Sequence, residues 1–288
     1  MKIFFTPSVS HLEPFIPGER GQFKIRKFND GELLVKLEDH VENEPVTIIT
    51  ATFPPSRHFC ELFFLLDTLK QQEAHIHVIF TYFGYERQDH PKPNTARGAL
   101  VITNCLKQFQ LDRITILHPH SHVIKELLPA KYVIPYDLYG SLIKELMIDT
   151  IVAPDTGALP ACTELAQRSN CKLAFVEKER LGNNQIQPLA VTIPENAGRA
   201  LIFDDIISTG ATIIQAATLL QEQGISEIFA LATHSFINEL GLQKLCQSPV
   251  QHLWISNSVP SHFSSADVSI INIAPALVPL TEKLDTDN

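Results

Sequence analysis

A chain of 288 residues with 44% hydrophobic side chains is long enough to bury the cores of about two domains. Its formal net charge of −9 argues against a nucleic-acid partner, because nonspecific binding to that backbone relies on a basic surface. No apolar run is long enough to cross a bilayer, and the N-terminal segment MKIFFTPSVS lacks the apolar stretch of a signal peptide, so we expect a cytoplasmic protein with no membrane partner.

Short apolar runs alternate along the chain with stretches of helical periodicity. The strand-like runs are VTIIT (46–50), HIHVIF (75–80), RITIL (113–117), TIVAP (150–154), LAFV (173–176), ALIF (200–203), EIFALAT (227–233), HLWIS (252–256) and VSIINI (268–273). Apolar residues at helical spacing lie between them at 59–71, 96–109 and 211–224. Strands separated by crossover helices predict an α/β fold built on parallel sheets.

The segment PYDLYGSLIKELMID (135–149) separates two halves of similar pattern, because one sheet finishes before its end and another opens after it. We predict two domains, residues 1–146 and 147–288, each a mainly parallel sheet flanked by helices. The halves resemble each other in pattern and not in residues.

Five cysteines are scattered along the chain without CxxC spacing, which indicates neither a zinc site nor a disulfide framework. We expect them to be reduced and buried, as small apolar side chains usually are. They are Cys60, Cys105, Cys162, Cys171 and Cys246.

Two adjacent carboxylates, Asp204 and Asp205, follow the apolar run that begins at Ala200. A turn from a strand into a helix needs a cap, but it does not need paired acids. In an open parallel sheet, ligands bind beyond the carboxyl ends of the strands. We therefore expect a polar ligand opposite the two acids, either sugar hydroxyls or a hydrated metal, because ionised carboxylates only accept hydrogen bonds.

The residues after these acids suit a phosphate. Gly210 permits close approach of the backbone, and the helix that follows presents unpaired amides and the positive end of its dipole. Hydroxyls come from Ser208, Thr209 and Thr212. A plain helix cap explains these hydroxyls but not the two acids ahead of them. The combination resembles the phosphoribosyl-binding loop of type I phosphoribosyltransferases.

Two further segments carry polar side chains suited to a nucleotide. The segment FTYFGYERQDHPKPNTARGAL (80–100) contains Arg87, whose fork can clamp phosphate oxygens, and Gln88, whose amide can read an adenine edge. The segment FNDGE (28–32) is typical of a hairpin turn, since Asp-Gly favours one. The chain contains no G-x-x-x-x-G-K-[ST] motif, which argues against a P-loop.

The order of these segments resembles the ribose-phosphate pyrophosphokinase family, also called phosphoribosyl pyrophosphate synthases. The resemblance implies two similar type I phosphoribosyltransferase-like domains, the first with ATP-contacting segments and the second with the ribose 5-phosphate loop. It also implies transfer of the pyrophosphoryl group of Mg-ATP to the 1-hydroxyl of ribose 5-phosphate, which yields 5-phosphoribosyl 1-pyrophosphate and AMP. FGYERQD is the most specific segment, because simple phosphoribosyltransferases lack it. The matching segments are FNDGE, YFGYERQD, ILHPHSH, IVAPDTGA, VEKER and IFDDIISTGAT, with weaker matches in ISNSVP and INIAPAL.

Carried over by position, the resemblance implies a role for each matching residue. Lys178 and Arg180 would stabilise the transferring group, and Mg²⁺ would be bound or oriented by His120 and Asp155. The residues that would contact ATP are Asp30, Gly31, Glu32, Arg87 and Gln88. Those that would bind ribose 5-phosphate are Arg180, Asp204, Asp205, Ser208, Thr209, Gly210, Ala211 and Thr212.

The two cations suit that chemistry, because phosphoryl-type transfer depends mainly on positioning and charge stabilisation. Lys178 and Arg180 alternate along the sequence, so an extended strand would point both side chains to one face. Without the surrounding matches, the same residues would be interpreted as a solvated edge shared with Glu177 and Glu179.

The histidine segment departs from the family. His118, Pro119 and His120 stand where the family usually has Asp-Leu-His, so the acid that would support the metal-site histidine is absent. His118, His120 and His122 alternate like metal ligands, but such a pattern is more often structural or solvent-facing, and we predict no zinc. Ser208 replaces an Asp that is common in the family's phosphate loop, a change compatible with phosphate binding.

Two rival functions fit parts of the sequence. A type I phosphoribosyltransferase would use the same loop but would not need the ATP-contacting segment. A regulatory or catalytically degenerate paralogue would bind nucleotide without turnover, and the altered histidine segment favours it. Retention of Lys178, Arg180, Asp155, Asp204 and Asp205 argues against such a paralogue. The family pattern also implies a homo-oligomer with shared active sites, in which the FNDGE loop of one subunit reaches the adenine held by the FGYERQD segment of another.

Overall fold

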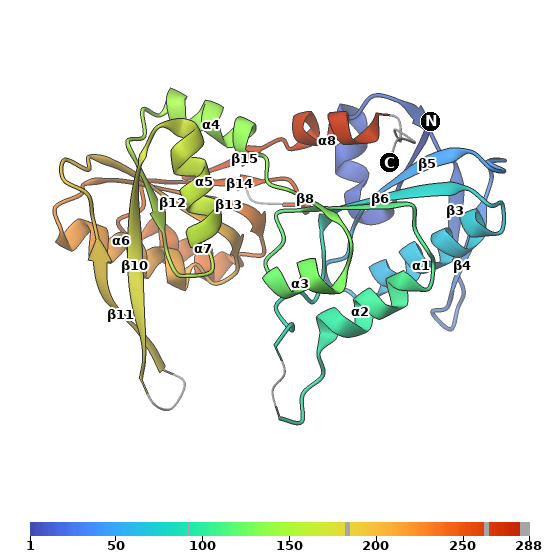
Figure 1. The fold of residues 1–288 in the computed structure, drawn as a ribbon, viewed down its shortest axis with the longest axis horizontal. Coiled ribbons are helices and arrows are strands. Elements are labelled where there is room, and N and C mark those ends of the chain that lie inside the picture. Colours follow the sequence, from blue (N-terminus) through green and yellow to red (C-terminus); the bar gives the residue numbers. More distant parts are fainter. Residues whose placement is uncertain (91–92, 182–184, 262–264, 283–288) are drawn as a thin grey trace. The chain divides into compact units, whose positions relative to one another are not determined.

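The computed structural model describes residues 1–90, 93–181, 185–261 and 265–282, with the side chains of 178–190 outside the description. Its contacts divide the chain into two compact units (Figure 1). Unit 1 contains Met1–Val133, the short segment Ser258–Pro260 and the chain from Ala274 onward. Unit 2 contains Ile134–Asn257 and Ser261–Ile273.

Unit 1 is built on a parallel sheet and a separate hairpin. Its strands are β1 (Lys2–Phe5), β2 (Glu19–Arg20), β3 (Phe23–Lys27), β4 (Leu33–Leu37), β5 (Pro45–Ala51), β6 (His75–Tyr82), β7 (Arg113–Leu117) and β8 (Lys131–Val133). Its helices are the 3-10 helix η1 (Pro7–Phe15) and the α-helices α1 (Arg57–Lys70), α2 (Gly98–Lys107), α3 (His122–Leu127) and α8 (Ala274–Thr281). Neighbours in the order β2-β1-β5-β6-β7-β8 pair in parallel, whereas β3 and β4 pair antiparallel.

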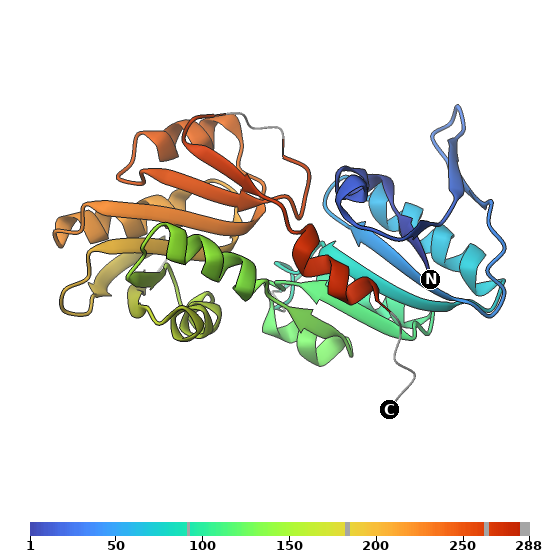
Figure 2. The same ribbon diagram turned by 90° about the horizontal axis from the view of Figure 1, so that it is seen from above.

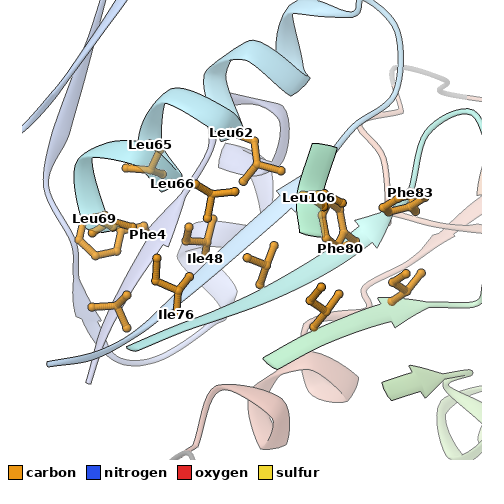
Figure 3. Close-up of a cluster of buried hydrophobic side chains, with 14 of the residues drawn as sticks. Phe4, Ile48, Leu62, Leu65, Leu66, Leu69, Ile76, Phe80, Phe83 and Leu106 are labelled. Carbon is orange, nitrogen blue, oxygen red and sulfur yellow. The ribbon is translucent and has the colours of Figure 1, made fainter. Parts of the chain in front are cut away.

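Helix α1 covers the sheet of unit 1 with leucines at helical spacing. Leu62, Leu65, Leu66 and Leu69 are fully buried in one cluster with Ile48 of β5 (Figure 3). Their spacing of three, four and seven residues sets them on one side of the helix. Burying each leucine contributes roughly 1.5–3 kcal/mol, so this packing holds α1 firmly on the sheet.

Unit 2 is built on a larger sheet with one antiparallel edge. Its strands are β9 (Thr150–Ala153), β10 (Lys172–Leu181), β11 (Gln185–Thr192), β12 (Arg199–Ile207), β13 (Glu227–Ser235), β14 (His252–Ser256) and β15 (Val268–Ile271). Its helices are α4 (Tyr136–Glu145), α5 (Leu159–Ser169), α6 (Ala211–Glu222) and α7 (Glu239–Cys246). The strand order is β11-β10-β9-β12-β13-β14-β15, and among these described strands only the β10–β11 pair is antiparallel.

Helices lie on both sides of the unit 2 sheet (Figure 2). Each side has its own apolar cluster. One cluster joins Ile202 of β12 to Ala216 and Leu220 of α6. The other joins Phe203 of β12 to Leu165 of α5. Successive residues of a strand point to opposite faces, which is why Ile202 and Phe203 serve different clusters.

The predicted fold class is confirmed, because both sheets are mainly parallel and flanked by helices. Each strand-like run of the sequence lies wholly or mostly in an observed strand, and the three predicted helices correspond to α1, α2 and α6. The strands β1, β2, β3, β4, β8 and β11 contain none of the predicted strand-like runs. Of these, β2, β3 and β8 are short and at most partly buried, so they carry no continuous buried apolar run. Within the described ranges, no helix is long and apolar enough to span a membrane.

The division between the units falls at residues 133 and 134, earlier than the predicted boundary at 146. Helix α4 belongs to unit 2 because Tyr139 and Ile143 are buried in one cluster with Leu165 of α5. The hydroxyl of Tyr139 also lies 2.8 Å from the hydroxyl of Thr233 in β13. Near the C-terminus the chain returns to unit 1 with α8.

All five cysteines are free thiols, but the expectation that they are buried was wrong for three of them. Cys60, Cys105 and Cys246 are exposed on α1, α2 and α7. A helix turns every side to solvent or core within 3.6 residues, so a cysteine's place in a helical stretch does not by itself reveal its face.

Candidate functional site

The paired acids of unit 2 lie within the last residues of β12. The sequence predicts them directly after the strand, but parallel pairing with β13 continues from Asp204 opposite Ala232 to Ile207 opposite Ser235. The strand is longer than its apolar run because β13 is equally long at this edge. Both acids therefore stay at the carboxyl end of the sheet, where ligands of such folds bind.

The two carboxylates are close to one another. The backbone N–H of Asp205 donates to Oδ1 of Asp204 at 2.9 Å, and the N–H of Ile206 donates to Oδ1 of Asp205 at 2.7 Å. Burial, followed by the negative charges of Asp205 and Asp155, raises the pKa of Asp204 well above its ordinary value. A donor or a cation beside Asp204 would relieve this repulsion.

Asp155 joins the same group of acids from the loop that follows the neighbouring strand β9. Its Oδ1 accepts from the backbone N–H of Gly157 at 3.0 Å and of Ala158 at 3.2 Å, which fixes the carboxylate at the start of α5. The buried Cys162 of α5 interacts electrostatically with Asp155, and its thiol donates to the Phe203 carbonyl oxygen at 3.3 Å. Burial and the nearby carboxylates raise the pKa of Cys162 well above its usual range, which favours the protonated thiol over the nucleophilic thiolate.

The carboxylates of unit 2 offer the oxygen ligands that magnesium prefers. Their mutual repulsion, visible in the raised pKa of Asp204, is of the kind that a cation relieves. In the part of the chain that the structure describes, no three His, Cys, Asp or Glu side chains are arranged to hold a metal by themselves. Magnesium still fits these residues, because it keeps several waters and binds through one or two carboxylates together with substrate phosphates.

The loop after β12 has the backbone conformation that its glycine predicts. Gly210 has a φ of 76°, in the left-handed region, and is the N-cap of α6. The first helical bond runs from the N–H of Ile214 to the Gly210 carbonyl oxygen at 2.9 Å. The start of α6 thus presents its first amides and its positive dipole end beside the hydroxyls of Ser208, Thr209 and Thr212. This arrangement suits an anion.

A second glycine, Gly241 of α7, allows that helix to pack closely against the loop. A Cβ at Gly241 would lie 2.9 Å from the Thr209 carbonyl oxygen and 3.0 Å from Cγ1 of Ile237. The helix is fixed here because the Asn238 side chain accepts from the Gly241 N–H at 2.8 Å. Sequence reasoning missed Gly241, since an isolated glycine early in a helix shows only a weak signal of close packing.

The two predicted catalytic cations belong to β10. Lys178 and Arg180 pair with Pro188 and Ile186 of β11, so the backbone is extended as predicted. An irregularity in the register lies just before them, between Glu177 and Lys178. Their side chains lie outside the described residues, and their roles stay predictions.

In unit 1, the segment after β6 leaves its predicted ATP contacts accessible. Arg87 and Gln88 are exposed. The turn is held by the N–H of Gln88, which donates to the Tyr85 carbonyl oxygen at 2.9 Å. Gly98, at the start of α2, leaves room for the Gln88 side chain, because a Cβ at Gly98 would lie 2.7 Å from Oε1 of Gln88.

Between these exposed residues and β6 lies Glu86, a buried acid that sequence reasoning missed. Its side chain accepts from the backbone N–H groups of His120 and, at 3.3 Å, Ser121. Three residues further on, Asp89 accepts from the Ser121 hydroxyl and lies 2.7 Å from the His90 ring. Burial opposes ionisation of Asp89, but the hydrogen bonds from Ser121 and His90 outweigh it and lower the pKa of Asp89.

The histidines of the HPHSH segment differ in exposure. His118 is buried with a φ of 38°, whereas His120 and His122 are exposed. The structure assigns His120 to unit 1 and Asp155 to unit 2, so the two predicted magnesium residues belong to different units.

The segment FNDGE forms the predicted hairpin turn between β3 and β4. The N–H of Phe28 donates to the Glu32 carbonyl oxygen at 2.9 Å, the N–H of Glu32 donates to Oδ1 of Asp30 at 3.0 Å, and Gly31 has a φ of 99°. Beside this turn is a cavity of about 520 Å³ whose lining carries two cations, Lys27 and Arg57. Gly31 and Glu32 also line it.

Comparison with known proteins identifies relatives along most of the chain. The family described as the N-terminal domain of ribose phosphate pyrophosphokinase matches residues 15–109, and the one described as the phosphoribosyl synthetase-associated domain matches residues 169–279. A ribose-phosphate pyrophosphokinase from Sulfurisphaera tokodaii is 31% identical over 265 residues, which cover 87% of this chain and 88% of that one. Another from Methanothermobacter thermautotrophicus is 29% identical and covers 92% of this chain and 91% of its own. The crystal structure of phosphoribosylpyrophosphate synthetase from Mycobacterium smegmatis has the same fold, with a TM-score of 0.85, 22% identity and 97% coverage of both chains.

Proposed function

Because the chain belongs to the ribose-phosphate pyrophosphokinase family, we propose that it transfers the pyrophosphoryl group of Mg-ATP to the 1-hydroxyl of ribose 5-phosphate. The products are 5-phosphoribosyl 1-pyrophosphate and AMP, and the activated sugar feeds nucleotide biosynthesis. The observation that carries the proposal is the group of carboxylates beside the α6 N-terminus, with the pKa of Asp204 raised by its neighbours.

Ribose 5-phosphate suits this place chemically. The amides at the start of α6 and the hydroxyls of Ser208, Thr209 and Thr212 match the 5-phosphate, together with the backbone of Gly210 and Ala211. The ribose hydroxyls are donors, and Asp204 and Asp205 accept from them.

Transfer then requires charge stabilisation more than covalent chemistry. Lys178 and Arg180, on the extended β10, stabilise the negative charge of the transferring group, and Arg180 also contacts the sugar phosphate. Asp155 and His120 would hold or orient magnesium, which would neutralise charge on the phosphate oxygens.

ATP binds through unit 1. The exposed Arg87 clamps phosphate oxygens and the exposed Gln88 reads the adenine edge. Asp30, Gly31 and Glu32 form a hairpin turn whose acids accept from the adenine amino group. We propose that this turn comes from a second subunit, so that the protein is a cytoplasmic homo-oligomer with shared active sites.

A non-catalytic paralogue is the second candidate, and one observation favours it. His118 stands where the family usually has an acid, so the acid that would support the metal-site histidine is absent. Such a protein would bind ATP and leave it intact.

A single assay separates these functions. The purified protein is incubated with ribose 5-phosphate, Mg²⁺ and ATP, and the nucleotide and sugar products are identified. We expect AMP and 5-phosphoribosyl 1-pyrophosphate in equal amounts. Formation of ADP would reject pyrophosphoryl transfer, and ATP binding without any product would favour the paralogue.

A further inference from the structure

Glu86 is a buried carboxylate to which the proposed chemistry gives no task. Its residue surface is only 2% exposed, although Arg87 and Gln88, the next two residues, are exposed. A carboxylate is rarely buried to this degree unless hydrogen bonds or an opposite charge compensate for the lost hydration. Its contacts therefore indicate what it does.

One oxygen of Glu86 binds the backbone of the HPHSH segment. Oε2 accepts from the N–H of His120 and from the N–H of Ser121, the latter at 3.3 Å. A carboxylate that accepts two backbone amides fixes two consecutive peptide groups, and bonds of this charge-assisted kind are about twice as strong as neutral ones. The position of the His120 backbone is thus tied to Glu86.

A second carboxylate of the same segment strengthens this attachment. The Ser121 hydroxyl donates to Oδ2 of Asp89, and the same oxygen of Ser121 accepts from the N–H of Val123 at 3.0 Å. Ser121 is the N-cap of α3, so Asp89 also orients that cap. The FGYERQD segment and the HPHSH segment are joined at two points.

The turn that precedes His120 needs such support. His118 has a φ of 38°, and Pro119 restricts its backbone further. On the other side, the N–H of His118 donates to the Val133 carbonyl oxygen at 2.8 Å. A strained backbone persists only where the surrounding structure holds it, and here β8 holds one end while Glu86 holds the other.

We propose that Glu86 is a positioning residue, which sets the backbone of His120 at a fixed place relative to Arg87 and Gln88. This inference rests on the proposed function, in which these three residues meet the nucleotide and its magnesium. The contacts that carry this role are the backbone N–H groups of His120 and Ser121, so the role depends on how far Oε2 of Glu86 reaches.

Two substitutions of Glu86 separate the effect of side-chain length from the effect of charge. Glu86→Gln keeps the length of the side chain and one acceptor oxygen but removes the charge, whereas Glu86→Asp keeps the charge and withdraws the oxygens by one methylene. Glu126→Asp and Glu126→Gln are matched controls, since Glu126 is exposed on α3 beside the same turn. All four variants are compared with the full-length wild type.

The first measurement does not depend on activity. Hydrogen–deuterium exchange is followed by mass spectrometry in peptides covering residues 118–127. Glu86→Asp is expected to speed exchange of the His120 and Ser121 amides by about 10-fold or more, because they lose their acceptor. Glu86→Gln and both controls are expected to stay within about threefold of wild type. Unchanged exchange in Glu86→Asp would overturn the proposal, even for a protein without turnover.

The second measurement is steady-state kinetics. Loss of a residue that orients a metal-site histidine typically lowers activity by about 10–100-fold, which we expect for Glu86→Asp in kcat, with KM for ribose 5-phosphate unchanged. Glu86→Gln should retain most of the activity. If Glu86→Gln is inactive and Glu86→Asp is normal, the charge matters and positioning is rejected. A wild type that makes no AMP would reject the proposed function alone, and the exchange data would still decide the role of Glu86.

Discussion

The two units use partly or fully buried carboxylates in opposite ways. In unit 1, Glu86 accepts backbone N–H groups from His120 and Ser121, so its charge is met by donors of the protein itself. In unit 2, Asp204 lies against Asp205, and burial together with the negative charge of its neighbours raises the pKa of Asp204. An acid met by internal donors holds structure in place, whereas crowded acids are suited to donors or a cation that a ligand brings.

This difference also separates what each unit contributes to the proposed reaction. Unit 1 supplies a preformed frame for the exposed Arg87 and Gln88. Unit 2 holds carboxylates in an arrangement that costs stability until a ligand binds, which is typical of sites selected for function. We therefore expect substitutions of carboxylates in unit 2 to change activity and stability in different directions more often than substitutions in unit 1.

The largest effect is expected for Lys178→Ala in unit 2. A strong preorganised electrostatic contact typically contributes about 10²–10³ in kcat, and we expect that loss with little change in ATP affinity. Steady-state kinetics and equilibrium binding of ATP measure the two quantities. A raised KM with normal kcat would contradict a role in stabilising the transferring group.

The next effect is expected for Asp204→Asn, which should lower kcat/KM by about 100-fold through lost charged hydrogen bonds to the sugar. The same change should stabilise the unliganded protein, by about 1 kcal/mol, because it removes a crowded charge. Thermal unfolding without ligands checks this gain. Equal loss of activity and stability would show that Asp204 is a structural acid like Glu86.

The stability gained on replacing Asp204 by asparagine has a defined pH dependence. Because the pKa of Asp204 is raised on folding, its contribution to stability is full below the ordinary value of 3.8 and is lost as pH rises through the folded pKa. Asp204→Asn should therefore raise the melting temperature more at pH 8 than at pH 4. A gain that does not grow with pH would exclude ionisation as its cause.

The strands, and part of the site, could be predicted because their signals are local. Buried parallel strands appear as continuous apolar runs, and Gly210 between hydroxylic residues marks a tight turn into a helix. Glu86 and Gly241 carry no such signal. The partners of Glu86 lie 34 and 35 residues away, and Gly241 matters only because Thr209 packs against it. Contacts of this kind depend on how the chain folds back, which a single sequence does not contain.

A smaller effect is expected in unit 1 at acid pH. Burial, followed by the charges of Arg113 and Lys131, lowers the pKa of His77 to about 4, and the ring lies 2.8 Å from the Thr115 hydroxyl. The unfolded chain binds a proton near pH 6.5 and the folded chain near 4, so stability is full above 6.5 and falls as pH drops. The free energy of unfolding should fall by about 2 kcal/mol between pH 7 and pH 5 through protonation of His77 alone.

His77→Gln should remove that slope, and urea unfolding at both pH values measures it. His122→Gln is the matched control, since His122 is an exposed histidine of the same unit at the start of α3. An acid sensitivity that survives His77→Gln unchanged would assign it to other groups.

The smallest effect is expected for Gly241→Ala, which tests whether the loop of unit 2 depends on close packing. The new Cβ would lie 2.9 Å from the Thr209 carbonyl oxygen, so the loop or α7 must shift by a few tenths of an ångström. Such a displacement at a phosphate site should raise KM for ribose 5-phosphate by about 10-fold and leave KM for ATP unchanged. Gly140→Ala is the control, because a Cβ there would lie at an ordinary 3.7 Å from the Ser169 hydroxyl. Replacing glycine by alanine within a helix otherwise stabilises by roughly 0.5–1 kcal/mol, so Gly140→Ala should raise the melting temperature with normal kinetics. If Gly241→Ala behaves in the same way, the packing of α7 does not position the loop. The anion site of unit 2 then depends only on the local segment between β12 and α6, as the sequence predicts.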